Sequence, residues 1–499
     1  MSVVAPASSF LGKAGPLVLA RTVSAGVTVL IPLVLTRALA LPEFGTYKQL
    51  LLVAQTLHFM LPFGVAQSLY YFLPRTSERR AYLGQTLVFL TGVSLAAVVL
   101  LALLGGHVST YFSNPELLRH RVLLAVYVVG TIVSSPLEIV FTAEGRTKVA
   151  AGVYLGSDAA RTLAMVLPVL AGQGLAGLMA GMAGWAALRA LGTAWLFWRH
   201  RGAWFSTGLF VGQLKYAAPF GAAVAITVPQ LLAHQYAVSF SVSPEDFAIY
   251  AVACFQLPLV NLLLTPVSEV LMVRVSELDS QGGLEEGVRC YREATAKLAY
   301  AFLPLTAFCC VAAPELITAL FGSKYQAATP LYQVGVLATA LAIFPVEGVL
   351  RATGRTAHIF SASVLKAVST VPIVYAGVRW FGMEGAMASS VITEVIGVGA
   401  LMVALPAALG VKQRPWREAL LMPWMDMGKA TAAALGAAMG VWALRAVLSG
   451  ADELLLVSVG WRWVPLFAAA GVFGAGYLFA LRLAGVRPLE LASSVLRGG

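Results

Sequence analysis

Ionisable side chains stand inside the long apolar runs of this 499-residue chain. A charged group at bilayer depth costs about 2.5–3.5 kcal/mol on insertion scales, so it usually faces a cavity or a partner of opposite charge. Arginine suits an anionic ligand because its planar fork makes two parallel hydrogen bonds to a phosphate. Carboxylates and imidazoles suit proton exchange. The residues in question are Arg21, His58, Glu138, Asp158, Arg161, Arg189, His234, Glu269, Glu347, Lys366 and Glu394.

These residues predict two overlapping sites, with no catalytic group and no metal ligand among them. Four residues are candidates for a positively charged site that binds the substrate: Arg21, Arg161, Arg189 and Lys366. The candidates for ion coupling are Asp158, Glu138, Glu394, His58 and His234. Taken together, the charges favour a polar cavity between two halves of the chain.

Each candidate also has a structural interpretation. Asp158 and Arg161 are three residues apart, so on a helix they share a face and can neutralise each other. Arg21 could extend to the cytoplasmic headgroups, and Lys366 could reach the same surface. Glu138 and Glu394 could pair with cations on other helices, and the two histidines could be hydrogen-bonded packing residues.

The composition assigns the helices that carry these charges to a membrane. Hydrophobic residues make up 59% of the chain and charged residues only 11%, against about 25% charged residues in soluble domains. The net charge of +11 lies in short loops between apolar runs, and no nucleic-acid motif accompanies it. The four cysteines have no metal spacing. We therefore expect no cofactor, and no nucleic acid among the partners.

The apolar runs predict an all-α polytopic protein with fourteen transmembrane helices, since a span needs roughly 20 residues. The stretch 150–197 is read as two helices joined at Gly172–Gly174, because 48 residues are too long for one span. The predicted ranges are 16–39, 49–73, 83–104, 122–142, 150–171, 174–197, 215–240, 247–272, 296–320, 327–349, 359–380, 383–408, 428–448 and 461–483.

Lysine and arginine alternate between rich and poor loops along this map, which predicts the orientation by the positive-inside rule. The rich loops include those around Arg75, Arg146, Arg289, Arg355 and Arg414. With these loops inside the cell, an even number of spans places both termini in the cytoplasm.

Part of the chain occurs twice. Short motifs recur in the same order, 203 to 209 residues apart, and duplicated halves are common in transporters. The matched positions are Phe44 and Phe247, Tyr47 and Tyr250, Gly145 and Gly354, and Gly174 and Gly382. Equal, even numbers of spans make the copies parallel. We expect a six-helix lobe at 1–201, a second at 202–408, and a loop with two additional helices at 409–499.

Several motifs resemble the polysaccharide flippase family, of the multidrug/oligosaccharidyl-lipid/polysaccharide exporter superfamily. They are Leu41–Tyr47, Pro62–Gly64, Glu144–Arg146, Leu214–Pro219, Leu320–Tyr325, Ala352–Arg355 and Gly382–Ala386. One departure is His234-Gln235-Tyr236 near the end of the seventh span, where many relatives carry an acidic residue.

The resemblance implies a flippase of the bacterial inner membrane that moves an undecaprenyl-pyrophosphate-linked oligosaccharide by alternating access. It also implies that transport is coupled to H+ or Na+. It implies a cationic lumen for the pyrophosphate, with Arg21 at the lumenal position of the first span. The implied partners are the lipid-linked oligosaccharide, the bilayer, and polysaccharide polymerase or export machinery.

Other functions remain open at this stage. A lipid II flippase would share fourteen spans and a cationic cavity. A multidrug or cation antiporter would have twelve spans and an acidic cavity. A polytopic glycosyltransferase or polymerase would need large external loops with catalytic residues, which the short loops of this chain do not offer.

Overall fold

The structure of the protein is a computed structural model, which describes residues 7–199, 203–256, 259–281, 284–410, 422–448 and 463–486. The described residues are helical, with short turns between helices, and contain no strand. Nine of their helices are long and apolar enough to cross a membrane, or ten if the bent pair near residue 62 counts as one span. The chain is a multi-pass membrane protein, and the predicted all-α class is confirmed.

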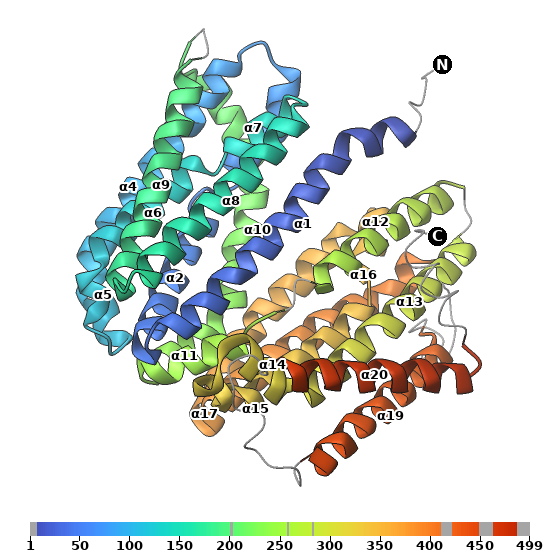
Figure 1. Cartoon of the computed structure of the whole chain (residues 1–499). Coiled ribbons are helices and arrows are strands. Elements are labelled where there is room, and N and C mark those ends of the chain that lie inside the picture. Colours follow the sequence, from blue (N-terminus) through green and yellow to red (C-terminus); the bar gives the residue numbers. More distant parts are fainter. Residues whose placement is uncertain are drawn as a thin grey trace. The chain divides into compact units, whose positions relative to one another are not determined.

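The chain divides into two compact units, Met1–Ala248 and Ile249–Gly499. This division does not test the predicted lobe boundary between residues 201 and 202, which stays a prediction. Helices of the first unit appear in Figure 1 in the blue-to-green part of the colour scale. They are α1 (Ala7–Ala38), α2 (Leu41–Met60), α3 (Val65–Phe72), η1 (Leu73–Arg75), α4 (Arg79–Tyr111), α5 (Glu116–Arg119), α6 (Arg121–Ser134), α7 (Leu137–Ala143), α8 (Thr147–Leu170), α9 (Gly174–Trp198) and α10 (Thr207–Ser239).

Helix α11 (Pro244–Ala253) crosses the boundary between the units. The second unit continues with α12 (Leu259–Ser280), α13 (Leu284–Val311), α14 (Ala313–Phe321), η2 (Ser323–Ala328), α15 (Thr329–Val336), η3 (Leu337–Ile343), α16 (Val346–Ala352), α17 (Thr356–Ala408), α19 (Trp424–Leu448) and α20 (Val464–Leu483). Each of the fourteen predicted ranges coincides with one or more of these helices.

Glycines with positive φ mark a break between helical segments at two corresponding places, one in each unit. Helix α8 ends at Leu170 and α9 begins at Gly174, whose φ of 56° is in the left-handed region. Gly382 has a φ of 58° and divides α17 into two helical segments. Both backbone conformations favour glycine because it has no Cβ. The predicted break in the stretch 150–197 is therefore confirmed.

A second pair of corresponding elements is a short helix that follows a proline. Helix α7 follows Pro136 and α16 follows Pro345, and each contains seven residues. Each is followed by a glycine with positive φ, Gly145 at 73° and Gly354 at 69°. The repeated motifs of the sequence therefore have the same backbone conformation in both units.

In the second unit, polar contacts attach the C-terminal helices α19 and α20 to α13 and α14. Arg445 of α19 donates from Nε to Oε1 of Glu315 at 2.6 Å. The Tyr300 hydroxyl donates to Oδ1 of Asp426 at 3.0 Å, and the Tyr477 hydroxyl donates to the Tyr300 carbonyl at 2.9 Å. Helices α19 and α20 lie side by side (Figure 1). The loop around Lys412, Arg414 and Arg417 falls outside the described residues.

Candidate functional site

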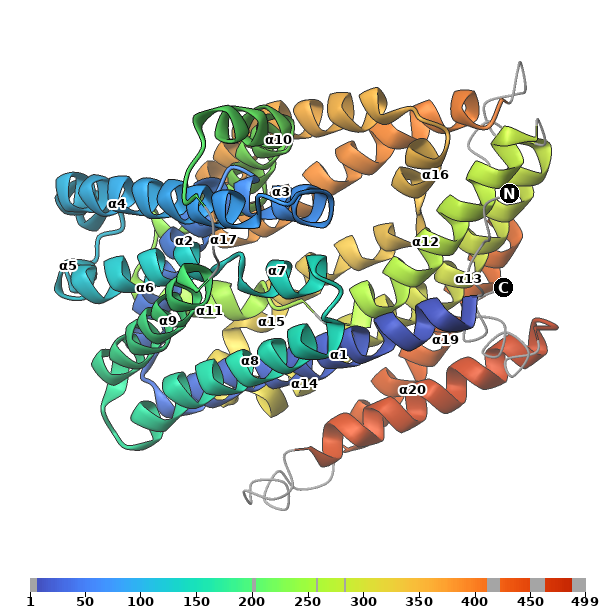
Figure 2. The ribbon, with the colours of Figure 1, turned by 90° about the horizontal axis from the view of Figure 1, so that it is seen from above.

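The charges of the first unit meet where α1, α7, α8 and α9 pack together. Helix α8 lies along α1 and also packs against α9 (Figures 1 and 2). The break at Pro136 starts the short helix α7, which has Glu138 in its first turn. This position favours a carboxylate, because the exposed N–H groups at a helix N-terminus carry partial positive charge.

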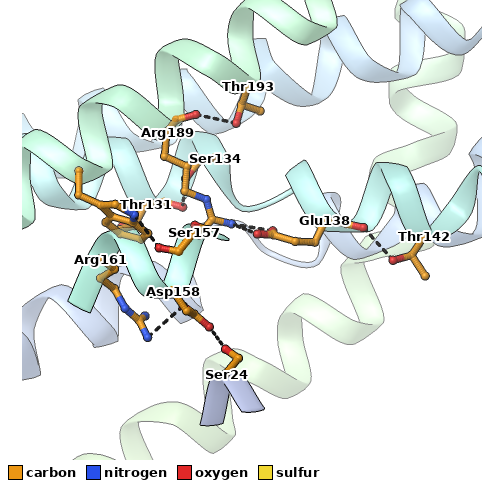
Figure 3. Close-up of polar contacts among 11 residues, drawn as sticks. Ser24, Thr131, Ser134, Glu138, Thr142, Ser157, Asp158, Arg161, Arg189 and Thr193 are labelled. Atoms are coloured by element: carbon orange, nitrogen blue, oxygen red, sulfur yellow. Dashed lines mark hydrogen bonds and ion pairs between the residues drawn. The ribbon is translucent and has the colours of Figure 1, made fainter. Parts of the chain in front are cut away.

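Glu138 and Arg189 form a buried ion pair between α7 and α9. One guanidinium nitrogen of Arg189, Nη2, donates to both carboxylate oxygens of Glu138, at 2.5 and 2.6 Å. The side chain of Glu138 is only 7% exposed and that of Arg189 only 18%. Figure 3 shows the two groups pointing toward each other from their helices. The predicted pairing of Glu138 with a cation on another helix is confirmed.

A second ion pair lies on α8 and is bonded to α1. Nη2 of Arg161 is 3.1 Å from Oδ1 of Asp158, one helical turn away, so the predicted local pair is confirmed. The same nitrogen donates to the Thr28 hydroxyl at 2.9 Å, and the Ser24 hydroxyl donates to Asp158. These bonds connect the pair to the face of α1 that packs on α8 (Figure 3).

The indole of Trp185 lies beside both arginines. Its ring centre is 5.8 Å from the guanidinium carbon of Arg161 and 5.4 Å from that of Arg189. Cation–π attraction at such distances contributes about 0.5–2 kcal/mol. Trp185 also donates its Nε1–H to the Ser157 carbonyl at 3.0 Å. The two ion pairs and this indole form what we call the arginine cluster, comprising Glu138, Asp158, Arg161, Trp185 and Arg189.

Buried polar atoms without a hydrogen-bond partner gather on the residues of this cluster and beside it. Among the described residues they include Nε of Arg161, Nε of Arg189 and the hydroxyl of Ser157. Nδ1 of His58, on α2, is also buried and has no hydrogen-bond partner among the described residues. Buried polar groups are nearly always satisfied in native proteins, so such a group in a site indicates water, an ion or a ligand. The arginine cluster therefore retains donor capacity beyond its two ion pairs.

In the second unit, Lys366 and Glu394 form an ion pair across the two segments of α17. Lys366 corresponds to Asp158 at an offset of 208 residues, and at the same offset Gly397 corresponds to Arg189. A Cβ on Gly397 would lie 3.0 Å from Cδ of Lys366, so the lysine stem fills the space beside this glycine. Corresponding helical positions of the two units thus carry different charges.

Two glutamates at corresponding positions of the repeat differ in their burial. Glu347 corresponds to Glu138, but its side chain is 49% exposed and it accepts from Arg351, four residues on, at 2.5 Å. In the described part of the chain, the buried centre with two arginines and two carboxylates belongs to the first unit.

The structure places two further predicted candidates, Arg21 and His234, on helices of the first unit. Arg21 lies on α1, three residues before Ser24, but its side chain is outside what the structure describes. His234 is partly exposed on α10, two residues before Tyr236, whose hydroxyl is 2.7 Å from that of Thr56. Sequence reasoning missed Trp185, Ser24 and Thr28. The spacing held a signal, because Trp185 lies four residues before Arg189 on one helix face.

Comparison of the structure places this arrangement in a known class of membrane-protein fold. The lipid II flippase MurJ, in an inward closed conformation, superposes with a TM-score of 0.71 at 14% identity, over 93% of this chain and 98% of that one. A multidrug resistance MATE transporter of the MOP superfamily, inward-facing, has a TM-score of 0.58 at 12% identity, over 80% and 96%. A MATE transporter of Vibrio cholerae has a TM-score of 0.52 at 14% identity, over 81% and 97%. The chain has the fold that these proteins share.

A sequence model of a protein family assigns the chain to a narrower group than the fold does. Residues 34–330, more than half of the chain, match the model of polysaccharide biosynthesis proteins. The chain belongs to this family, and the resemblance found in its sequence motifs is confirmed. No curated protein matches the chain in sequence.

Proposed function

We propose that the protein is a flippase that moves an undecaprenyl-pyrophosphate-linked oligosaccharide across the membrane by alternating access. The family supports a role in polysaccharide biosynthesis. The fold supports transport, because the solved proteins that share it are named as a lipid flippase and as multidrug transporters. The protein acts as a transporter and not as an enzyme.

The arginine cluster is the observation that carries this proposal. Two guanidinium groups within one set of packed helices suit the two phosphates of a pyrophosphate, since arginine binds phosphate oxygens through paired hydrogen bonds. Charges of this kind are costly at membrane depth and usually mark a substrate or ion pathway. The orphaned Nε atoms of Arg161 and Arg189 add two donors for an anionic group.

The carboxylates of the cluster couple substrate binding to an ion. In the structure Glu138 and Asp158 occupy hydrogen-bonding positions on the arginines that a phosphate would use. A proton or Na+ that neutralises Glu138 releases Arg189 for the pyrophosphate. Neutralising Asp158 releases Arg161 in the same way. Headgroup binding and uptake of the coupling ion are therefore linked.

Translocation in proteoliposomes tests this function. Wild-type protein should move a fluorescent undecaprenyl-pyrophosphate oligosaccharide between leaflets, and protein-free vesicles should not. Arg161→Gln and Arg189→Gln should each lower the rate by about 10-fold to 100-fold, because hydrogen bonds to a charged group contribute about 1.5–3 kcal/mol. Glu138→Gln, which removes one of the two coupling carboxylates, should weaken the dependence of the rate on an imposed pH or Na+ gradient, and Glu138→Gln together with Asp158→Asn should abolish it.

The matched control is Arg445→Gln, which removes an arginine from an ion pair of the second unit, outside the arginine cluster. This variant should keep the wild-type rate. Arg21→Ala tests the first-span arginine in the same assay, and a full rate would remove Arg21 from the substrate site. No translocation by the wild-type protein would refute the flippase.

A lipid II-type precursor is the second candidate substrate. It is favoured by the match to MurJ, which covers nearly all of both chains, whereas the MATE transporters match about four fifths of this one. Offering lipid II beside the lipid-linked oligosaccharide decides between them. Faster translocation of lipid II than of the lipid-linked oligosaccharide would identify lipid II as the preferred substrate.

The resemblance to polysaccharide flippases supports a place for the protein in the bacterial inner membrane, and the Lys/Arg bias supports an orientation with both termini in the cytoplasm. A flippase in this position would deliver its cargo to a polysaccharide polymerase or to export machinery on the other side. Co-purification with such a polymerase from membranes tests that partnership.

A further inference from the structure

A stack of aromatic rings lies at the end of α3 in the first unit and shares no residue with the arginine cluster. Tyr71 of α3 and Tyr216 of α10 stack with ring centres 4.6 Å apart and an angle of 21° between planes. Phe72 meets both rings edge-on, at 5.0 Å from Tyr71 and 5.3 Å from Tyr216. On its other side Phe72 stacks on the buried ring of Tyr82, at 4.8 Å.

Arg75 extends this stack with a cation. Its guanidinium carbon lies 4.2 Å from the centre of the Tyr71 ring, and its Nη1 donates to the Tyr71 carbonyl at 2.7 Å. Tyr71 is 40% exposed and Tyr216 is 49% exposed. We call Arg75, Tyr71 and Tyr216 the aromatic ladder, in this spatial order.

The helices that carry the ladder are held together by a buried hydrogen-bond network. Gln213 of α10 donates to the Ser68 hydroxyl of α3 and to the Thr86 hydroxyl of α4, each at 2.9 Å. Gln85 donates to Gln213 at 2.7 Å, and all four side chains are almost fully buried. Gln213 is three residues from Tyr216 on the same helix. The ladder is therefore held in place before any ligand arrives.

The backbone between α2 and α3 also fixes this end of the unit. The two helices meet at a bend of 40°. Phe63, in the bend, has a φ of 45°, which is uncommon for a non-glycine residue and occurs often at functional sites. Its ring packs where a Cβ on Gly221 would stand, 2.5 Å away. The bend thus fits closely against α10.

A sugar ring has the complementary chemistry. A pyranose has a face of C–H groups that packs on an aromatic ring, and a rim of hydroxyls that needs donors and acceptors. Arg75 and Tyr216 cover the Tyr71 ring, so the sugar would pack on the exposed Tyr216 ring, which Tyr71 supports. Tyrosine combines an apolar ring with a polar end, and neither ladder tyrosine makes a hydrogen bond through its hydroxyl within the described residues. The guanidinium of Arg75 supplies further donors.

The competing explanation is the band of aromatic residues found where membrane proteins meet the headgroups. The chain contains such a residue in Trp195, which is 59% exposed and lies 4.1 Å from the guanidinium carbon of Arg199 on the same helix. The ladder differs because its rings stack across two helices that a buried network holds in register. That arrangement builds a site, whereas a membrane anchor needs single rings.

We propose that the aromatic ladder binds the sugar portion of a lipid-linked oligosaccharide. This inference rests on the proposed function and adds a second contact for the cargo, beside the arginine cluster. The ladder lies at the end of α3 that leads into the basic loop of Arg75, Arg79 and Arg80, the side predicted to be cytoplasmic. Sugars are therefore recognised at the entrance for cargo coming from that side.

Binding of two paired probes tests the site in full-length protein. The probes are undecaprenyl pyrophosphate and the same lipid carrying a short N-acetylhexosamine oligosaccharide, each titrated in nanodiscs. Wild-type protein should bind the sugar-bearing probe about 10-fold more tightly. Tyr216→Leu and Tyr71→Leu should abolish this preference and leave the affinity for the bare lipid unchanged. Tyr216→Trp, which keeps an aromatic face, should retain it.

Two further variants keep the test decisive if a leucine variant fails to fold. Arg75→Gln changes an exposed side chain and should reduce the preference about 3-fold, because part of the hydrogen bonding is lost. Trp195→Leu, the control on α9, should behave as wild type. An unchanged preference in Tyr216→Leu or Arg75→Gln, or an equal loss in Trp195→Leu, overturns the ladder as a sugar site. Failure of the wild type to bind either probe refutes the proposed function itself.

Discussion

At the scale of single residues, the buried pair of Glu138 and Arg189 is the most informative contact of the chain. Removing two charges from water costs several kcal/mol for each ion, and their attraction repays this only with good geometry. Nη2 of Arg189 contacts both Glu138 oxygens, at 2.5 and 2.6 Å, and this attraction offsets part of the desolvation cost. Stability alone does not require such a pair, because a well-packed apolar pair is often as stable. The pair is therefore consistent with the ion and substrate binding that we propose for this site.

A double-mutant cycle measures this coupling. Glu138→Gln and Arg189→Gln should each destabilise the protein by about 3–5 kcal/mol, because each leaves a buried charge without its partner. The double variant should recover much of that loss. Thermal unfolding in a mild detergent, followed by tryptophan fluorescence, provides the measurement.

The repeat offers the control for this cycle. Glu347 and Arg351 occupy the corresponding short helix, and both side chains are about half exposed. Their cycle should give a coupling of about 0.3–0.5 kcal/mol, as for other exposed pairs one turn apart. Equal coupling energies in the two cycles would contradict the assignment of a buried functional pair to the first unit.

At the scale of helices, small residues set how closely α8 and α9 approach. A Cβ on Gly181 of α9 would lie 1.7 Å from the Ala164 carbonyl oxygen of α8, which no side chain can occupy. A Cβ on Gly184, less than one turn further along α9, would meet nothing within 4 Å. This close approach is typical of helix packing in membranes. It also sets the distance between Asp158 and Arg161 on α8 and Arg189 on α9.

Two alanine substitutions test this packing. Gly181→Ala should separate the helices and lower the stability by about 1–3 kcal/mol, as overpacking does. Gly184→Ala should be neutral, or stabilising by up to about 1 kcal/mol, because alanine favours a helix more than glycine does. The melting temperatures of the two variants in detergent provide the comparison. A similar loss for both would show that helix separation is not the cause.

At the scale of the whole molecule, the Lys/Arg bias leads to a topology that labelling can check. Ser77, before α4, and Ser323, at the start of η2, are both exposed and both close in shape to cysteine. In a variant whose four native cysteines are replaced, Ser323→Cys should react with a membrane-impermeant maleimide in intact spheroplasts. Ser77→Cys should react only after the membrane is opened. The opposite pattern would invert the orientation.

Much of the architecture was predictable because it depends on local chemistry. Long apolar runs predict transmembrane helices, and glycines such as Gly174 and Gly382 mark breaks between helical segments because their backbone conformation disfavours other residues. The repeat predicted corresponding elements, and α7 and α16 are such a pair. The local ion pair of Asp158 with Arg161 was predictable for the same reason, since one helix turn brings the two together.

The partners of the other charges were not predictable to the same degree. Glu138 and Arg189 are 51 residues apart in the chain, and Lys366 and Glu394 are 28 apart. Such contacts depend on which helix faces pack together. Trp185 is an example, because its spacing from Arg189 was visible but its place beside Arg161, on another helix, was not.

The sequence by itself determined that this chain is a helical membrane protein with repeated motifs and with charges inside its membrane segments. Helix formation and membrane insertion respond to composition and periodicity, which any stretch of about 20 residues already contains. Only the tertiary structure decided that the corresponding glutamates differ, with Glu138 buried against an arginine and Glu347 exposed. The physical reason is that burial and pairing come from the packing of distant helices, and packing assigned the charged centre to the first unit.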